Sequence, residues 1–179
     1  MILEAAGGLM LGAVIREAQA GQPSARVFEI HMRSDINGAV VGFDPVGVLL
    51  EPRVTVRWVC DGNVHTTTAY SPRNANHSQR IPVSAQPWDS GFLQPGQHFE
   101  VTLTVEGVYD YYCMPHEQAG MVGRLIVGRP SGPGTLPFDY FEAQGRHWLP
   151  VPAAAQKVFP SAGEILARRV VPSSLNFSS

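Results

Sequence analysis

The sequence has little charge and few cysteines. Asp, Glu, Lys and Arg make up only 16% of its 179 residues, and 13 basic against 15 acidic residues give a formal net charge of −2. No basic stripe is visible along the chain, which argues against a nucleic acid as partner. Hydrophobic residues reach 44%, enough for one packed core, so the composition is not that of a typical disordered chain. The 18 glycines and 15 prolines predict short strands joined by many turns, and therefore an all-β fold.

The apolar run near the N-terminus is too short to span a bilayer. It covers residues 2–15 and contains Glu4 and three glycines, whereas a membrane-spanning helix needs about 20 apolar residues. No positive charge precedes the run, unlike in a secretory signal, although Ala-Gln-Ala at 18–20 resembles a cleavage site. We expect residues 1–24 to form an extension with a short helix. A fragment of an export signal and a start codon inside a longer precursor are the alternatives, and membrane association through this segment stays open.

The segment from residue 108 to 127, VYDYYCMPHEQAGMVGRLIV, holds three side chains that bind soft or borderline metals: Cys113, His116 and Met121. A thiolate, an imidazole and a thioether belong to the donor set of a copper electron-transfer site. There, one thiolate and two imidazoles surround the ion, with a weak, long thioether bond on the axis. Pro115 stiffens the turn between Cys113 and His116 by fixing its own φ. The second imidazole must come from elsewhere in the chain.

This segment resembles the C-terminal copper loop of the plastocyanin, pseudoazurin and halocyanin branch of the cupredoxins. That family carries the pattern Gly-x-Tyr-x-Tyr/Phe-x-Cys-x-Pro-His-x-x-x-Gly-Met, which residues 107–121 match. The family's other histidine follows a strand with a Val-x-Trp or Val-x-Phe segment, and VTVRWVCDGNVH at 54–65 therefore nominates His65. WDSGFLQPGQHFEVTL, at 88–103, is similar to the family's lead into the penultimate strand.

The resemblance implies a cupredoxin Greek-key β-sandwich or barrel over residues 25–130, with a C-terminal extension over 131–179 that wraps the domain or holds a partner. It also implies one mononuclear type 1 copper ion, cycling between Cu(I) and Cu(II), as the cofactor. The implied metal ligands are His65, Cys113, His116 and Met121. The packing expected for the C-terminal extension rests instead on its own large apolar residues, such as Phe138, Phe141 and Trp148.

The ligand set decides how we interpret the two cysteines. Cys113 has a better use as a thiolate than as half of a disulfide, so we expect Cys60 to be a free, buried thiol on the strand before His65. The family usually has Asn directly after this histidine, and Thr66 stands there in this chain. The amide of Thr66 can still donate to the Cys113 sulfur, but its side chain must restrain the metal-binding loop differently from that of Asn.

Two further expectations concern the surroundings of the site. Residues 70–95 are rich in Pro, Ser, Asn and Gln, and we expect an irregular surface excursion in which His77 is exposed and Trp88 packs on the barrel. The segment 161–169, SAGEILARR, has the capping-box pattern of Ser with Glu three residues later, which predicts a short helix.

The resemblance implies a one-electron carrier. Four protein donors leave no open coordination position, and catalytic metals keep one, so we expect no enzymatic activity. Electrons would pass through the imidazole edge of His116, which Met114, Pro115 and Gly120 would surround as an apolar ring. The expected partners are redox proteins such as a c-type cytochrome or a terminal oxidase or reductase. The expected location is the periplasm or another compartment outside the cytoplasm, and the oligomeric state stays open.

Two other classes of protein compete with this interpretation. A domain or subunit of a copper oxidase or reductase assembly would need additional histidine pairs such as His-x-His, which the sequence lacks. A periplasmic copper carrier would favour clusters of exposed Met and His, whereas the five methionines of this chain are scattered.

Overall fold

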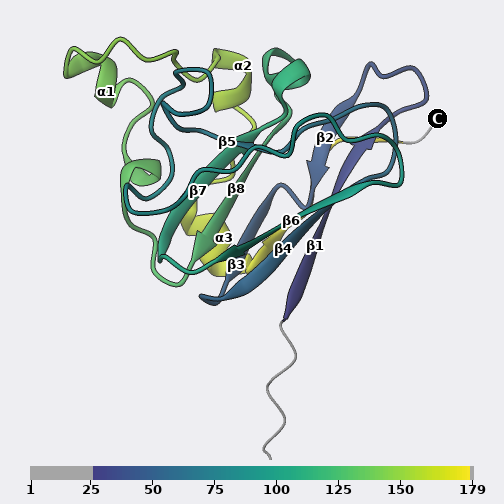
Figure 1. Cartoon of the computed structure of the whole chain (residues 1–179), viewed down its shortest axis with the longest axis horizontal. Helices are drawn as coiled ribbons and strands as arrows, with labels where there is room; N and C mark the ends of the chain where they lie inside the picture. Colours follow the sequence, from purple (N-terminus) through teal and green to yellow (C-terminus); the bar gives the residue numbers. More distant parts are fainter. Residues whose placement is uncertain (1–25, 178–179) are drawn as a thin grey trace, which may run out of the picture.

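The strands form two sheets that pack face to face (Figure 1). The computed structural model describes residues 26–177, so the helix expected within residues 1–24 lies outside the described residues. The strand order is β2-β1-β4-β6 in the first sheet and β5-β7-β8-β3-β9 in the second, which confirms the predicted all-β sandwich. The strands are β1 (Val27–Ser34), β2 (Val41–Asp44), β3 (Gly47–Leu50), β4 (Val54–Cys60), β5 (Thr68–Ala69), β6 (His98–Leu103), β7 (Gly107–Tyr112), β8 (Val122–Val127) and β9 (Val170–Val171).

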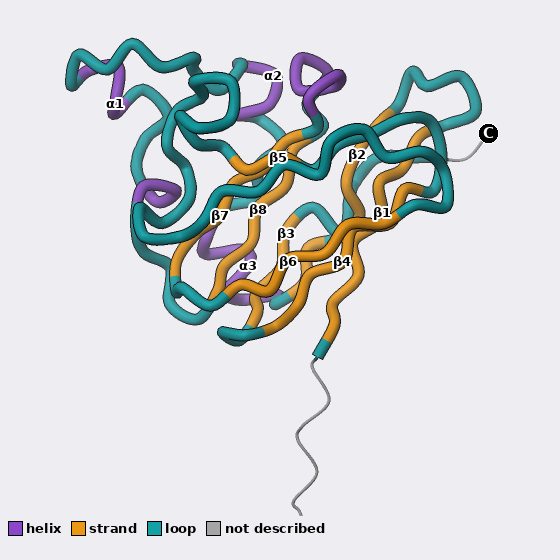
Figure 2. Tube along the Cα trace, in the orientation of Figure 1, coloured by secondary structure: helices purple, strands orange, loops and turns teal. Residues whose placement is uncertain are grey.

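Among residues 26–177, helices are short and few, and loops make up much of the rest (Figure 2). In the part of the chain that the structure describes, no helix is both long enough and apolar enough to cross a membrane. The α-helices all follow the last strand of the sandwich core, β8. The helical elements are the 3-10 turns η1 (Met114–Ala119) and η2 (Pro133–Thr135) and the helices α1 (Tyr140–Ala143), α2 (Ala153–Gln156) and α3 (Ala162–Arg168).

Strand β4 leads the chain to the first predicted ligand. Trp58 and Cys60 share its buried face and are inaccessible to solvent, whereas Arg57 lies on the opposite face. The strand pairs parallel with β1 and antiparallel with β6, so it lies in the interior of the first sheet. At Cys60 the strand ends, and a turn through residues 61–64 brings the chain to His65.

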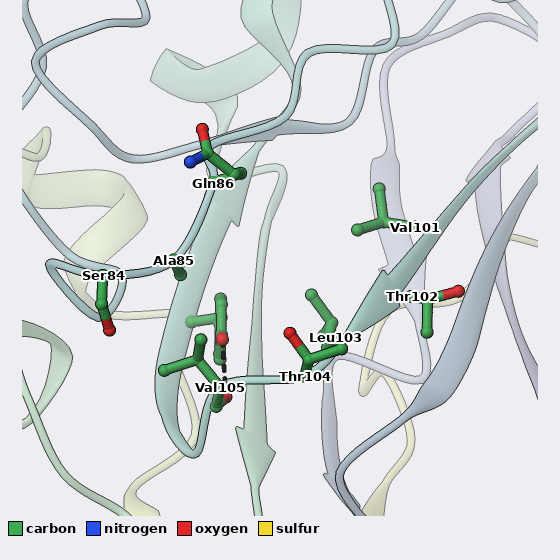
Figure 3. A pocket seen from close by; sticks show the side chains of 9 residues that line it. Ser84, Ala85, Gln86, Val101, Thr102, Leu103, Thr104 and Val105 are labelled. Atoms are coloured by element: carbon green, nitrogen blue, oxygen red, sulfur yellow. Dashed lines mark hydrogen bonds between the residues drawn. The ribbon is translucent and has the colours of Figure 1, made fainter.

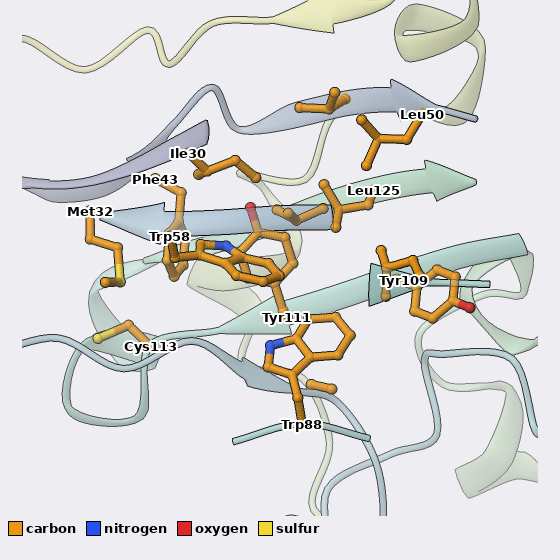
Figure 4. Close-up of a cluster of buried hydrophobic side chains, with 14 of the residues drawn as sticks. Ile30, Met32, Phe43, Leu50, Trp58, Trp88, Tyr109, Tyr111, Cys113 and Leu125 are labelled. Atoms are coloured by element: carbon orange, nitrogen blue, oxygen red, sulfur yellow. The ribbon is translucent and has the colours of Figure 1, made fainter. Parts of the chain in front are cut away.

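Aromatic rings fill the space between the sheets (Figure 4). The ring centroid of Trp58 lies 5.3 Å from that of Trp88 and 5.4 Å from that of Tyr111 in β7. Trp88 therefore packs the end of the 70–95 segment onto the barrel, as predicted. Cys113 directly follows β7 and belongs to the same buried cluster. Because large rings pack in preferred geometries, this cluster fixes the end of the strand that carries the sulfur.

Most of the extension covers the outer face of the second sheet, and residues 173–177 reach β1 and β2 of the first. Strand β9 pairs with β3, and Ile165 of α3 packs with Val108 of β7. As a result, β7 and β8 are buried on both faces. The helix predicted from the capping box is α3, and there Ser161 Oγ accepts a hydrogen bond of 3.0 Å from the amide of Glu164. The described part of the extension therefore packs on the sandwich.

Two buried arginines share one buried carboxylate beneath the extension. Asp110 of β7 is inaccessible to solvent, and it accepts hydrogen bonds from Arg80 at 3.0 Å and from Arg124 at 2.7 Å. Each guanidinium also reaches the extension, since Arg80 donates to the carbonyl of Gly134 and Arg124 to that of Pro160. The three charges therefore tie the extension to a strand that ends at the predicted site.

Replacing Asp110 by Asn should destabilise the protein strongly. The substitution keeps the size of the side chain but leaves two buried guanidinium groups without their counter-charge, which costs about 3–5 kcal/mol of unfolding free energy. Urea unfolding followed by tryptophan fluorescence measures the loss. The control is Glu100→Gln, which removes an exposed carboxylate that pairs with Arg57 at 2.6 Å and should leave the midpoint unchanged. Equal midpoints for both variants would contradict the role of Asp110.

Candidate metal centre

Backbone hydrogen bonds close the turn between β7 and β8 and join the three predicted ligands that it carries. The amide of Cys113 donates to the carbonyl of Met121 at 2.9 Å, and the amide of Met121 donates to that of His116 at 3.1 Å. The amide of His116 in turn donates to the carbonyl of Cys113 at 3.0 Å. Gly120 ends η1 with a φ of 84°, in the left-handed region that favours glycine. The turn is thus locally stiff.

His65 joins this turn from a distant part of the chain. Its Nδ1 lies 3.2 Å from Nδ1 of His116 and 3.6 Å from Sγ of Cys113, and the sulfur lies 3.4 Å from Nδ1 of His116. A point about 2.0 Å from all three atoms exists, which fits the about 2.0–2.3 Å of imidazole and thiolate bonds to a borderline metal ion. Among residues 26–177, these are the three side chains from the His, Cys, Asp and Glu set that could hold a metal together.

Met121 follows Gly120 on the same turn. Its side chain is inaccessible to solvent and belongs to the same buried cluster as Cys113. Its backbone is bonded to both Cys113 and His116. Met121 therefore lies where β7 ends and β8 begins, and its role as the axial ligand stays a prediction.

Two hydroxyl residues restrain the candidate ligands. The amide of Thr66 donates to Sγ of Cys113 at 3.3 Å, as predicted, and its Oγ1 accepts from the amide of Met114 at 2.8 Å. The threonine side chain therefore restrains the β7–β8 turn through a hydrogen bond, at the position where the family usually has Asn. Ser34, at the end of β1, bonds Nε2 of His65 at 2.9 Å and so leaves Nδ1 directed at the other donors. No signal in the sequence pointed to Ser34, since its partner lies 31 positions away.

Burial sets the protonation of the three donors. It lowers the pKa of His65 to about 4, with the nearby His116 acting in the same direction, and it also lowers the pKa of His116. Burial raises the pKa of the Cys113 thiol to about 11, although the hydrogen bond from Thr66 acts against it. At neutral pH both imidazoles are therefore neutral, and the thiol keeps its proton until a metal displaces it.

The extension covers one side of the turn and leaves the other open. Gly120 is buried, and a Cβ added there would lie 3.0 Å from Val158 of the extension. Met114 and Pro115 are exposed, and His116 is half-buried. The predicted surface ring around His116 is therefore right for Met114 and Pro115 and wrong for Gly120, because the extension packs against that residue.

The predicted exposure of His77 is wrong. Its relative accessibility is only 8%, and its ring stacks on Tyr112 with centroids 4.5 Å apart. The 70–95 segment is irregular, as expected, but several of its residues are buried, and Leu149 of the extension pairs with His77. The sequence offered a polar surrounding for His77 and no sign of the distant segment that covers it.

A cleft of about 160 Å³ lies away from this centre, between residues 84–86 and the end of β6 (Figure 3). Its lining is made of Ser, Thr, Gln, Tyr and small apolar residues, without His, Cys, Asp or Glu. The hydroxyl of Tyr109, which also lines the cleft, already donates to the carbonyl of Val105 at 2.6 Å. The cleft therefore offers no metal ligands or acid–base groups.

Comparison with known proteins places the centre in a family. The family model described as copper binding proteins, plastocyanin/azurin family, matches residues 30–128. A chloroplastic plastocyanin of Oryza sativa subsp. indica is 61% identical over 91 residues, 51% of this chain and 58% of the relative. A chloroplastic plastocyanin of Tetradesmus obliquus is 26% identical over 117 residues, 63% of this chain and 81% of the relative. With a chloroplastic plastocyanin of Hordeum vulgare, the match covers only 30% of the relative's length.

Solved structures agree on the fold. A pseudoazurin from Sinorhizobium superposes with a TM-score of 0.53 and 26% identity, covering 74% of this chain and 92% of the pseudoazurin. The pseudoazurin of Methylobacterium extorquens AM1 also gives 0.53, at 22% identity, covering 80% of this chain and 96% of that protein. The family model ends at residue 128, so residues 131–177 of the extension lie outside the matched region.

The fold and the donor set define a cupredoxin. The chain belongs to the plastocyanin/azurin family of copper binding proteins, which confirms the resemblance of its ligand loop. Family membership, together with one thiol and two imidazoles in mutual contact, makes a single type 1 copper ion its cofactor.

Metal uptake at pH 7 should release about one proton per ion, because the thiol of Cys113 is the one donor that must lose a proton. Both imidazoles are already neutral, since the pKa of His65 is about 4 and that of His116 is lowered as well. A pH indicator in weak buffer measures the release while Zn²⁺, which has no redox chemistry, is added to the apo-protein. Two protons per ion at pH 7 would contradict neutral imidazoles.

Proposed function

We propose that this protein carries single electrons between redox proteins by means of one copper ion bound to His65, Cys113, His116 and Met121. The observation that supports this most directly is the triangle of two imidazole nitrogens and one sulfur with edges of 3.2–3.6 Å. A thiolate and two imidazoles with a weak axial thioether are the donor set of blue-copper electron-transfer sites.

The bound copper supplies the exchange of one electron between Cu(I) and Cu(II). The task of the chain is to keep the donors in nearly the same positions in both states. Burial of Cys113 and Met121, the backbone bonds across the turn and the Ser34 hydroxyl on His65 all restrict movement. Hydrogen bonds such as that from the amide of Thr66 to the sulfur also tune the reduction potential.

Electrons would leave and enter through His116. It is half-buried, whereas His65 and Cys113 are inaccessible, so its imidazole is the proposed ligand nearest to solvent. Met114 and Pro115 beside it are exposed. Exposed apolar residues of this kind mark contact sites, and electron-transfer encounters use small interfaces. The proposed partners are a c-type cytochrome or a terminal oxidase or reductase.

A carrier fits better than the competing classes. Four protein donors would leave no position for a substrate, which argues against an oxidase or reductase. The burial of His65, Cys113 and Met121 argues against a protein that hands its copper to others. We propose a location in the periplasm or another compartment outside the cytoplasm, in line with the resemblance to the plastocyanin and pseudoazurin branch.

Cys113→Ser should abolish the intense visible thiolate-to-copper band of the Cu(II) protein, because a hydroxyl cannot replace the soft sulfur donor. In the wild type a mild reductant should bleach this band. The matched control is Cys60→Ser, which alters the other buried thiol and should keep the band. The absorption spectrum of the copper-loaded proteins decides the matter, and a band that survives in Cys113→Ser would refute the proposed ligand set.

Met121→Leu should raise the reduction potential while keeping the visible band. The substitution roughly conserves volume but removes the thioether, and this loss weakens the binding of Cu(II) more than that of Cu(I). A redox titration measures the potential. Met114→Leu is the control, because Met114 is 43% exposed on the same turn and is not a proposed ligand. Identical potentials for the two variants would argue against an axial Met121.

A further inference from the structure

The residue after His116 carries a buried carboxylate. Glu117 is 8% exposed, whereas Gln118 and Ala119, which follow it in η1, are exposed. Taking an ionised carboxylate out of water is costly unless the group is paired and hydrogen-bonded. Specific partners must therefore hold this side chain inside the turn.

Both oxygens of Glu117 have such a partner. The hydroxyl of Tyr70 donates to Oε1 at 2.6 Å, and Nε2 of His77 donates to Oε2 at 3.1 Å. The shorter distance is typical of a hydroxyl bonded to an ionised carboxylate. Burial, followed by the charge of Glu117, raises the pKa of Tyr70, so its hydroxyl remains a donor.

Both ring nitrogens of His77 have partners. Its Nε2 donates to Glu117, and its Nδ1 lies 3.1 Å from the carbonyl oxygen of Asn74 and 3.3 Å from the hydroxyl of Tyr112. The negative charge of Glu117 favours the protonated ring. Burial lowers the pKa of His77, but the hydrogen bond and the charge of Glu117 outweigh this effect and raise the pKa.

The segment that supplies these partners is clamped by the extension. The amide of Ser78 donates to the carbonyl of Leu149 at 3.0 Å, and the amide of Leu149 donates to that of Asn76 at 2.8 Å. On its other side, η1 itself contacts α2 (Figure 1). The extension therefore holds both the turn that carries Glu117 and the segment that carries His77.

We propose that Glu117 is a positioning residue for His116, with Tyr70 and His77 as its anchors. The two side chains project from consecutive residues, so a fixed carboxylate restricts rotation of the backbone that carries the imidazole. The negative charge of Glu117 beside the ligand also favours Cu(II) over Cu(I). This inference rests on the proposed role of His116 as a copper ligand, and it gives the buried part of the 70–95 segment a function in setting the reduction potential.

Tyr70→Phe tests the proposal with the full, copper-loaded chain. It removes one hydrogen bond to Glu117 without changing any charge. We expect the ratio of Cu(II) to Cu(I) binding constants to change about tenfold, which equals a shift of about 59 mV, together with an altered Cu(II) EPR spectrum. The matched control is Tyr109→Phe, which also removes a buried hydroxyl bonded at 2.6 Å. Tyr109 lies near the start of β7, away from the site, so this variant should change neither the reduction potential nor the EPR spectrum.

Glu117→Gln should give a larger shift than Tyr70→Phe, because it removes the charge and turns an amide group towards His77. In the Glu117→Gln background, Tyr70→Phe should then add little, since coupled residues are not additive. Urea unfolding of each variant separates stability from potential. Unchanged potentials and EPR spectra in both variants, with only lowered unfolding midpoints, would overturn the inference alone. A wild type without the thiolate-to-copper band would overturn the proposed function and the inference together.

Discussion

Two imidazole nitrogens and one sulfur are held 3.2–3.6 Å apart, facing one another, with only His116 partly open to solvent, and the rest of the structure serves that arrangement. The two imidazoles can lie this close without electrostatic repulsion, because burial lowers their pKa values and keeps both rings neutral. Separate parts of the chain enforce it. The end of β1 restrains His65 through Ser34, the residue after His65 restrains the sulfur, and the β7–β8 turn carries the other donors.

The extension changes the chemistry of the sandwich as well as its size. By covering the outer face of the second sheet it turns that face into an interior, where Asp110 and Glu117 are buried charges. Each of these carboxylates lies on or beside β7 and binds partners that contact the extension. Fully satisfied hydrogen bonds to buried carboxylates hold the bonded groups rigidly in place. They therefore connect the site to the extension.

Local patterns could be predicted well from the sequence. The alternation of β4, the helix α3 with its Ser161 cap and the grouping of Cys113, His116 and Met121 all depend on residues close in the chain, where spacing and stiffness decide the geometry. The exposure of His77 and Gly120 could not be predicted in the same way. Both are covered by residues 149–158, and burial of this kind follows from long-range packing that no local pattern encodes.

The sequence by itself determined the donor chemistry: one thiolate, one imidazole and one thioether within nine residues, on a turn that Pro115 stiffens and that a glycine at position 120 allows to bend. It nominated His65 only through a resemblance, since nothing local distinguishes that histidine from the others. Only the tertiary structure brought Nδ1 of His65 to the sulfur, turned its other nitrogen to Ser34 and enclosed Glu117 between Tyr70 and His77. The physical reason is that ligand type is a property of single residues, whereas the position and protonation of each donor depend on which distant segments exclude water from it.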